Sequence, residues 1–193
     1  MKLYDISQEV FSCAVYPGDP KPERQILSST ASGDLYNLTA FSMCAHNGTH
    51  IDAPFHFLED GRTVDQMDLS IFVGDCYVAR HKGDVSGADA EGILHKAEGV
   101  QRILIAGNIT VTEEAAEVFA RDKILLLGNE SQTVGPIEAP IKVHNILLSA
   151  NVVLLEGIRL ENIDEGVYFL SASPLLLKGA DGSPCRAILI KDI

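Results

Sequence analysis

The stretch His46-Asn-Gly-Thr-His-Ile-Asp-Ala-Pro-Phe-His-Phe57 carries three of the six histidines in the chain and one aspartate. His46, His50 and Asp52 stand on even positions. If the backbone is extended there, the alternation of side chains along a strand directs all three to one face. Gly48 shares that face and has no side chain, which leaves room for an ion between the flanking groups. The stretch therefore predicts a metal site built on one strand.

The end of this strand is predicted at Pro54, because proline cannot donate to a sheet ladder and restricts the residue before it. His56 follows the expected turn and can reach back towards the same centre. Two imidazoles and a carboxylate, with no thiolate in the stretch, suit Zn2+, Mn2+ or Fe2+. The alternative is a polar surface strand with hydrogen-bonded histidines. Three histidines and an aspartate in matching positions make that the weaker interpretation.

This stretch resembles the signature H-x-G-T-H-x-D-x-P-x-H of the metal-dependent cyclase/hydrolase family typified by bacterial kynurenine formamidase. Every fixed letter of the signature is present here, as His46, Gly48, Thr49, His50, Asp52, Pro54 and His56. The resemblance implies a site for two divalent ions per chain, Zn2+ or Mn2+, with His46, His50 and Asp52 as ligands. It also implies that Asp52 bridges the ions and that His56 transfers protons.

Size and composition point to one ordered globular domain over residues 1–193, since 46% of the residues are hydrophobic. The formal net charge of −12 argues against binding to nucleic acid or an anionic membrane, because phosphate contacts need a basic surface. The four cysteines form no C-x-x-C pair, which predicts reduced thiols. The N-terminus lacks an apolar signal core, and no apolar run reaches the ~20 residues that span a bilayer. We therefore expect a cytoplasmic protein.

The hydrophobic pattern predicts an α/β fold. Strands are predicted over residues 2–6, 11–16, 24–30, 35–45, 74–80, 102–106, 123–127, 151–155, 166–171 and 187–190, and helices over 64–71, 86–97, 112–120 and 142–149. The segments 24–30 and 35–45 are expected to pair as a hairpin, the second running directly into the metal stretch. The apolar run over 123–127 is typical of a strand covered on both faces, and the strand–helix–strand order before it predicts a right-handed crossover. The family resemblance implies a single-domain swivelling β/β/α fold, with a mixed sheet flanked by helices, and a homodimer or homotetramer.

The second half of the site is predicted from His144, on the last helix, and Glu156, at the end of the next strand. Taken alone, each is an ordinary polar residue. The family draws its two remaining metal ligands from such positions, so the resemblance assigns both as ligands. The loop over residues 128–136 leaves the carboxyl end of a buried strand, where α/β proteins keep their sites, although a plain connection is the alternative. The family's usual Ser-Val-Asp is Thr133-Val134-Gly135 here, which lacks the carboxylate.

The turn over residues 16–20 is predicted from its proline and glycine. In the family this turn lines the substrate pocket and follows an aromatic residue, usually tryptophan, which is Tyr16 here. The resemblance therefore assigns Tyr16 to substrate binding and leaves the substrate itself open. The closing segment over 174–187 also resembles the family, and Gly179, Asp181, Gly182 and Pro184 are expected to form a loop that borders the site. Arg186 is expected to pair with a carboxylate, with a structural partner favoured over a carboxylate of the substrate.

The expected activity is hydrolysis of a small-molecule C–N amide by attack of metal-bound hydroxide, with His56 carrying the proton to the leaving nitrogen. No G-x-S-x-G motif is present, which argues against a serine hydrolase. Aryl formamides such as N-formylkynurenine are the first substrate class. A cyclic amide or imide of the isatin type is the alternative, and a metal-binding protein without turnover is the third hypothesis.

Overall fold

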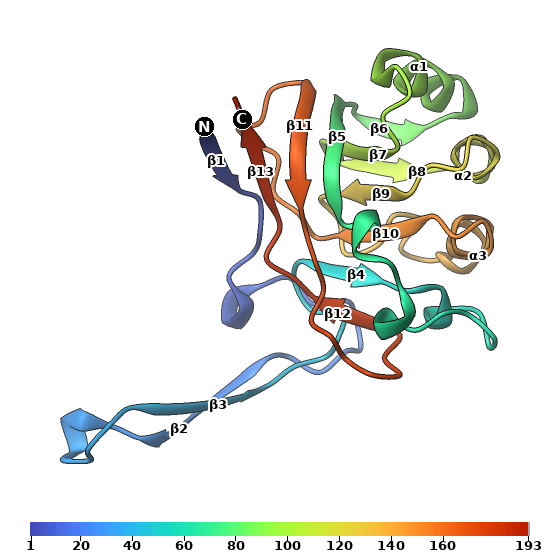
Figure 1. Ribbon diagram of the computed structural model, residues 1–193. Helices are drawn as coiled ribbons and strands as arrows, with labels where there is room; N and C mark the ends of the chain where they lie inside the picture. The colour runs from blue at the N-terminus through green and yellow to red at the C-terminus, as the bar shows by residue number, and fades with distance from the viewer. Residues whose placement is uncertain (193) are drawn as a thin grey trace.

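A curled mixed sheet of nine strands organises the computed structural model, which describes residues 1–192 (Figure 1). The strand order is β1-β13-β11-β5-β7-β9-β10-β4-β12. Their bounds are β1 Lys2–Asp5, β4 His50–Asp52, β5 Val73–Arg80, β7 Arg102–Ala106, β9 Leu126–Asn129, β10 Val153–Glu156, β11 Gly166–Ser171, β12 Gly182–Pro184 and β13 Ile188–Lys191. The central strands β5, β7, β9 and β10 are parallel, and antiparallel strands extend the sheet on both sides. In Figure 1 the sheet bends beyond β5, so that β7, β9 and β10 run across the direction of β11 and β13.

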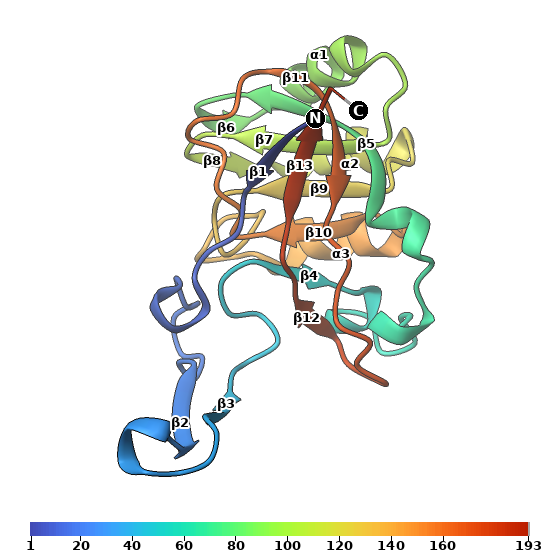
Figure 2. The same ribbon diagram turned by 60° about the vertical axis from the view of Figure 1, so that its left-hand side comes forward.

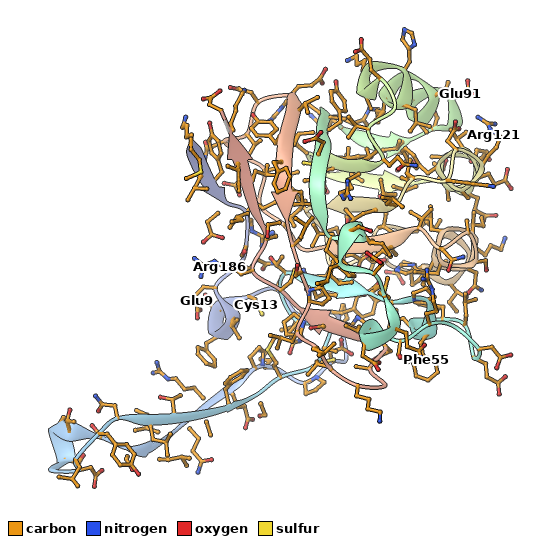
Figure 3. The ribbon with its side chains drawn as sticks, in the orientation of Figure 1. Glu9, Cys13, Phe55, Glu91, Arg121 and Arg186 are labelled. Carbon is orange, nitrogen blue, oxygen red and sulfur yellow. The ribbon has the colours of Figure 1, made fainter. Side chains whose placement is uncertain are left out.

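Three helices cover one face of the parallel strands: α1 Gly87–Ala97, α2 Glu113–Arg121 and α3 Ile141–Ser149. Ser86 and Thr112 cap the first two by accepting from the backbone N–H of the third helical residue. The helices bury an apolar stripe that includes Phe119. Burial of a phenylalanine side chain of this kind stabilises the folded state by about 1.5–3 kcal/mol. Their outer face carries charged pairs such as Arg121 with Glu91 (Figure 3). A short parallel pair, β6 Gly83–Val85 and β8 Ile109–Val111, lies beside them.

The opposite face of the sheet is buried as well. Alternate residues of one strand point to different cores: Ile103 and Ile105 pack with the helices, whereas Leu104 packs in the second core. Strands buried on both faces explain the near-continuous apolar runs in the sequence. The predicted α/β class, with a mixed sheet flanked by helices, is confirmed.

A two-stranded arm projects from the body, formed by β2 Glu23–Ser28 and β3 Leu38–Ser42 (Figures 1 and 2). A single 3₁₀ turn, Thr30–Ser32, lies near its tip. The predicted hairpin is confirmed. Its second strand does not run into the metal stretch, however, because β3 ends at Ser42 and a turn separates it from β4.

Other local predictions were wrong or displaced. The strand predicted over 11–16 is a 3₁₀ turn at Val10–Ser12, because the Glu9 carboxylate accepts from the N–H groups of Phe11 and Ser12 and holds the chain curled. The helix predicted over 64–71 is two separate 3₁₀ turns. The strand predicted over 123–127 begins later, at Leu126, and the short strands β6, β8 and β12 were not predicted. Within the described residues, no helix is long and apolar enough to cross a membrane.

Candidate metal centre

The centre is built on β4, which lies between β10 and β12 in the sheet. His50 and Asp52 are the two ends of this short strand and stand on the same face, as their spacing predicted. His46 does not belong to the strand. It lies in a turn in which Asn47 N–H donates to the Cys44 carbonyl and Gly48 adopts a positive φ of 65°. The prediction of one extended strand holding all three residues was therefore wrong, although the turn still brings His46 to the same centre.

Two further elements complete the cluster. Glu156 ends β10 and is the register partner of His50 on β4. His144 lies on α3, which crosses over this edge of the sheet and contacts β10. The side chains of His50, Asp52, His144 and Glu156 are each no more than 3% exposed, and that of His46 is 13% exposed. The structure therefore brings together all five residues that the sequence analysis assigned as ligands.

Each of the three histidines donates one ring N–H away from the centre. His50 Nδ1 lies 3.0 Å from the Gly48 carbonyl, and His144 Nδ1 lies 2.9 Å from the Pro140 carbonyl. His46 Nε2 lies 2.8 Å from Asp181 Oδ2. Because these partners only accept, the hydrogen bonds fix each ring and turn its other nitrogen towards Asp52 and Glu156. This is the arrangement that metal-binding histidines adopt.

The spacing of the inward-facing atoms fits a divalent cation. His50 Nε2 is 3.3 Å from Asp52 Oδ1 and 3.6 Å from Glu156 Oε2. His144 Nε2 is 3.4 Å from Glu156 Oε1 and 3.6 Å from Asp52 Oδ2. These separations are longer than good hydrogen bonds. Donor atoms held about 2.0–2.1 Å from one ion in tetrahedral directions are themselves roughly 3.3 Å apart. His50, Asp52 and Glu156 form one group that could hold an ion, and His46, Asp52 and His56 form another.

The buried carboxylates of the cluster favour a positive charge beside them. Burial alone would lower the pKa of His50, but the hydrogen bonds and charges of Asp52 and Glu156 outweigh it and raise that pKa to about 9. Burial opposes the shift at His46 too, where Asp181 and Asp52 raise the pKa to about 10. Burial would raise the pKa of Asp52, yet the histidines hold it well below its usual value. In the absence of a metal ion, the negative charges of the buried Asp52 and Glu156 are therefore neutralised by protonated histidines.

His56 lies at the solvent side of this cluster, at the end of a 3₁₀ turn that begins with Pro54. Its ring stacks on that of His46 at a centroid distance of 4.0 Å, and its side chain is 27% exposed. His56 Nδ1 lies 3.2 Å from Asp181 Oδ2. Hydrogen bonds from His46 and His56 lower the pKa of Asp181 strongly. Sequence reasoning placed Asp181 only in a bordering loop, and its position directly before Gly182 was the available signal.

A cavity of about 390 Å³ opens onto the cluster, within the size range of small-molecule sites. Its lining includes all five candidate ligands, His56 and Asp181, together with Tyr16, Asp19, Cys44, Phe57, Gln132, Thr133 and Pro140. Tyr16 therefore lies where the resemblance implied, and its hydroxyl donates to the Ile137 carbonyl at 2.9 Å. The loop after β9 lines the cavity through Gln132 and Thr133. Gly135 packs against Val143 instead, so the missing carboxylate is not a gap in the lining.

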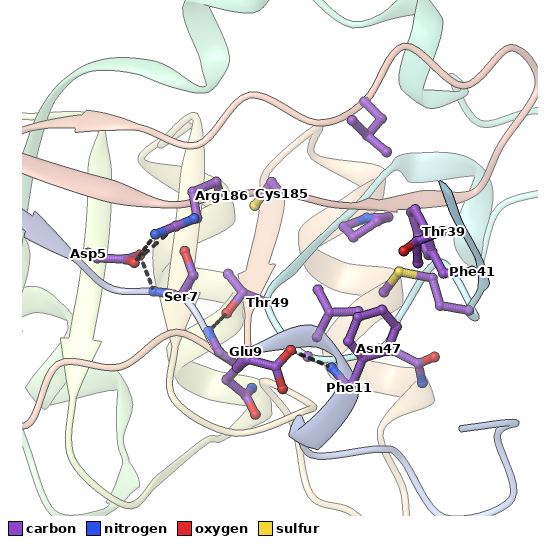
Figure 4. A pocket seen from close by; sticks show the side chains of 16 residues that line it. Asp5, Ser7, Glu9, Phe11, Thr39, Phe41, Asn47, Thr49, Cys185 and Arg186 are labelled. Atoms are coloured by element: carbon purple, nitrogen blue, oxygen red, sulfur yellow. Dashed lines mark hydrogen bonds and ion pairs between the residues drawn. The ribbon is translucent and has the colours of Figure 1, made fainter. Parts of the chain in front are cut away.

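A second, larger cavity of about 880 Å³ lies behind the metal stretch, between the body and the root of the arm (Figure 4). Asn47, Gly48 and Thr49 line it, but none of the candidate ligands does. Arg186 contacts Asp5 there through Nε at 3.0 Å, which confirms its structural role. The smaller cavity is therefore the candidate active site, because of the two it is the one lined by the candidate ligands and His56.

Comparison with known proteins also points to a metal-dependent enzyme. The family model described as "Putative cyclase" matches residues 4–136. Kynurenine formamidases from Bacillus cytotoxicus and Bacillus anthracis are each 32% identical, covering 96% and 97% of this chain and 95% and 97% of their own. A solved structure described as a potential metal-dependent hydrolase with cyclase activity superposes with a TM-score of 0.84 at 28% identity, covering 100% of this chain and 99% of its own. An isatin hydrolase bound to thioisatinate reaches a TM-score of 0.85 at 18% identity, covering 99% of this chain and 93% of its own, and shows the shared fold. The chain belongs to the cyclase family of metal-dependent hydrolases.

Proposed function

We propose that the protein is a metal-dependent hydrolase that cleaves the C–N bond of a small amide, of the kynurenine formamidase type. The convergence of His46, His50, Asp52, His144 and Glu156 on one buried centre at the base of a cavity carries this proposal. The relatives that align over nearly the whole chain support it, since several are kynurenine formamidases.

These five side chains would hold divalent metal, two ions per chain, with Zn2+ first and Mn2+ second. Asp52 is suited to a shared position, because its Oδ1 faces His46 and His50 whereas its Oδ2 faces His144. When bound, such an ion lowers the pKa of water from about 15.7 to about 7 and polarises a carbonyl. The protein keeps these donors free of bulk water, and it fixes the outward nitrogen of each histidine in advance.

His56 is the residue that we assign to proton transfer. Its Nδ1 faces Asp181, and no protein partner is found for its Nε2 within residues 1–192. That nitrogen is therefore free to take a proton at the cavity and deliver it to a leaving nitrogen. Histidine is the side chain most often used to accept and donate protons near neutral pH. A metal-binding protein without turnover would have no use for this free nitrogen.

The substrate class that we propose is an aryl formamide, with a cyclic amide or imide as the competing outcome. Tyr16 and Phe57 give the cavity two aromatic walls, which suit a flat acyl or aryl group. The deciding experiment incubates Zn2+-reconstituted and Mn2+-reconstituted protein with N-formylkynurenine, formanilide and isatin. We expect metal-dependent deformylation that a chelator abolishes. Ring opening of isatin without deformylation would reassign the substrate, and no metal-dependent hydrolysis of any of them would overturn the proposal.

We also propose a cytoplasmic homodimer or homotetramer. All four cysteines are unpaired, which suits a reducing compartment. The projecting arm exposes large apolar side chains, which supports burial against another copy.

A further inference from the structure

Asp181 ends the loop between β11 and β12 and touches two histidines at once. A single oxygen, Oδ2, lies 2.8 Å from His46 Nε2 and 3.2 Å from His56 Nδ1. One of these rings belongs to the candidate metal ligands and the other to the proposed proton carrier. Asp181 lines the cavity, and its side chain is 43% exposed, so it sits at the mouth rather than among the inward-facing donors.

The backbone around Asp181 is built for this contact. The Asp181 carbonyl accepts from Ala53 N–H at 2.9 Å, which continues the pairing of β12 with β4 by one residue. Gly182 follows, and a Cβ there would lie 2.5 Å from His46 Cε1, so only glycine lets the imidazole approach. The loop before it is held by Val64 N–H on the Ala180 carbonyl and by the Asp65 carboxylate on Gly179 N–H.

The two contacts decide which nitrogens of the rings are free. A carboxylate only accepts, so both His46 Nε2 and His56 Nδ1 donate to it. His46 then presents its Nδ1 to Asp52 Oδ1, at 2.8 Å, a contact that a proton makes in the metal-free chain and that a bound cation would replace. His56 presents its Nε2 to the cavity. One oxygen thus orients a metal-binding nitrogen and a proton-carrying nitrogen.

We propose that Asp181 is a positioning residue that holds the His46 and His56 rings together, so that metal binding and proton transfer share one support. This inference rests on the proposed function for the role of His56. Asp181 is not assigned as a metal ligand, because it contacts His46 Nε2, on the opposite side of that ring from Asp52.

The test compares Asp181→Ala and Asp181→Asn with the wild type. Zn2+ affinity, measured by competition with a chelator and without substrate, should weaken about 10–100-fold in Asp181→Ala, the usual effect of losing a carboxylate behind a metal-binding histidine. Long-range ¹H–¹⁵N spectra of the Zn2+-loaded protein should show His56 protonated at Nδ1 in the wild type and at Nε2 in Asp181→Ala. At saturating Zn2+, kcat should fall about 10–100-fold with KM changed less than about twofold. Asp181→Asn keeps one accepting oxygen and should lie between the two.

Asp60→Asn is the matched control, because it makes the same change at an exposed residue in the turn just after His56. It should leave all three measurements unchanged. Unaltered Zn2+ affinity and His56 tautomer in Asp181→Ala would overturn the proposal, and so would a change in only one of them, since the role would then not be shared. If the wild type hydrolysed no amide, the proposed function would fail while the Zn2+ and spectroscopic measurements still decided the role of Asp181.

Discussion

At the scale of single residues, the candidate metal ligands face the metal position, whereas His56 faces the cavity. His56→Ala should keep its metal, because the inward-facing nitrogens belong to His46, His50 and His144. Turnover should fall by roughly 10²–10⁴, the contribution of a positioned acid or base. Metal content by elemental analysis and kcat on the same preparation check this. Loss of metal together with activity would make His56 a ligand instead.

Asp52 is the residue whose loss should be felt most widely. Its two oxygens face three histidines, and it is 1% exposed. Asp52→Ala should lose both ions and should also lower the melting temperature, because metal that binds only the folded chain adds to the free energy of unfolding. Elemental analysis and thermal melts with and without Zn2+ provide the measurement. A variant that kept full Zn2+ stoichiometry would remove Asp52 from the ligand set.

Tyr16, like Gly135, is a residue at which this chain departs from the formamidase pattern. Its hydroxyl donates a hydrogen bond to the Ile137 carbonyl, which fixes the ring against the loop before α3. Tyr16→Trp removes this bond but offers a larger flat face for stacking on an aryl group. We expect kcat/KM for N-formylkynurenine to rise about tenfold relative to a smaller formamide, with metal content unchanged. An unchanged ratio would show that Tyr16 does not set specificity.

At the scale of elements, the site depends on a sheet edge that the sequence only partly reveals. The alternation at His50 and Asp52 was readable, because strand periodicity is a local property. Helix α3 and the end of β10 were readable for the same reason, but only the family resemblance assigned His144 and Glu156, which lie on them, to the site. The turn at His46 was not readable, since it depends on Gly48 N–H finding the Ala14 carbonyl far away in the sequence. Strand β12 has only three residues and no pattern of its own, so the sequence placed Asp181 in a bordering loop without predicting its contacts with His46 and His56.

The convergence of β4, β10 and α3 makes the stability of the metal-free protein depend on pH. The pKa values of His46 and His50 in the folded chain are raised to about 10 and about 9, above the unperturbed value of about 6.5. Their stabilising effect is therefore complete below about pH 6.5 and lost as the pH rises through 9 to 10. Metal-free protein should melt at a lower temperature at pH 9.5 than at pH 6.5. Zn2+-loaded protein should lose less, because the metal replaces the protons, and equal losses in both forms would contradict the expectation.

At the scale of the whole molecule, the arm is the feature that the isolated chain does not explain. A two-stranded ribbon is only marginally stable in water, yet the arm exposes apolar side chains along its length, among them Ile26, Leu35, Tyr36 and Phe41. The arm over residues 23–42 carries only Glu23, Arg24 and Asp34 as charged residues, in a chain of net charge −12. It is therefore a surface on which two copies can meet without strong repulsion.

The position of the larger cavity suggests how two arms would pair. Thr39, Phe41 and Met43, at the root of the arm, line this cavity, whereas Leu35 and Tyr36 lie near the tip. Two arms that run antiparallel about a twofold axis place each tip at the root of the other, which closes the contact symmetrically. The double variant Leu35→Asp/Tyr36→Asp should therefore have a lower oligomeric mass by light scattering than the wild type. Leu69→Asp, a change at another exposed leucine, which lies on the body, should keep the wild-type mass. A monomeric wild type, or a double variant with unchanged mass, would show that the arm does not join copies of this chain.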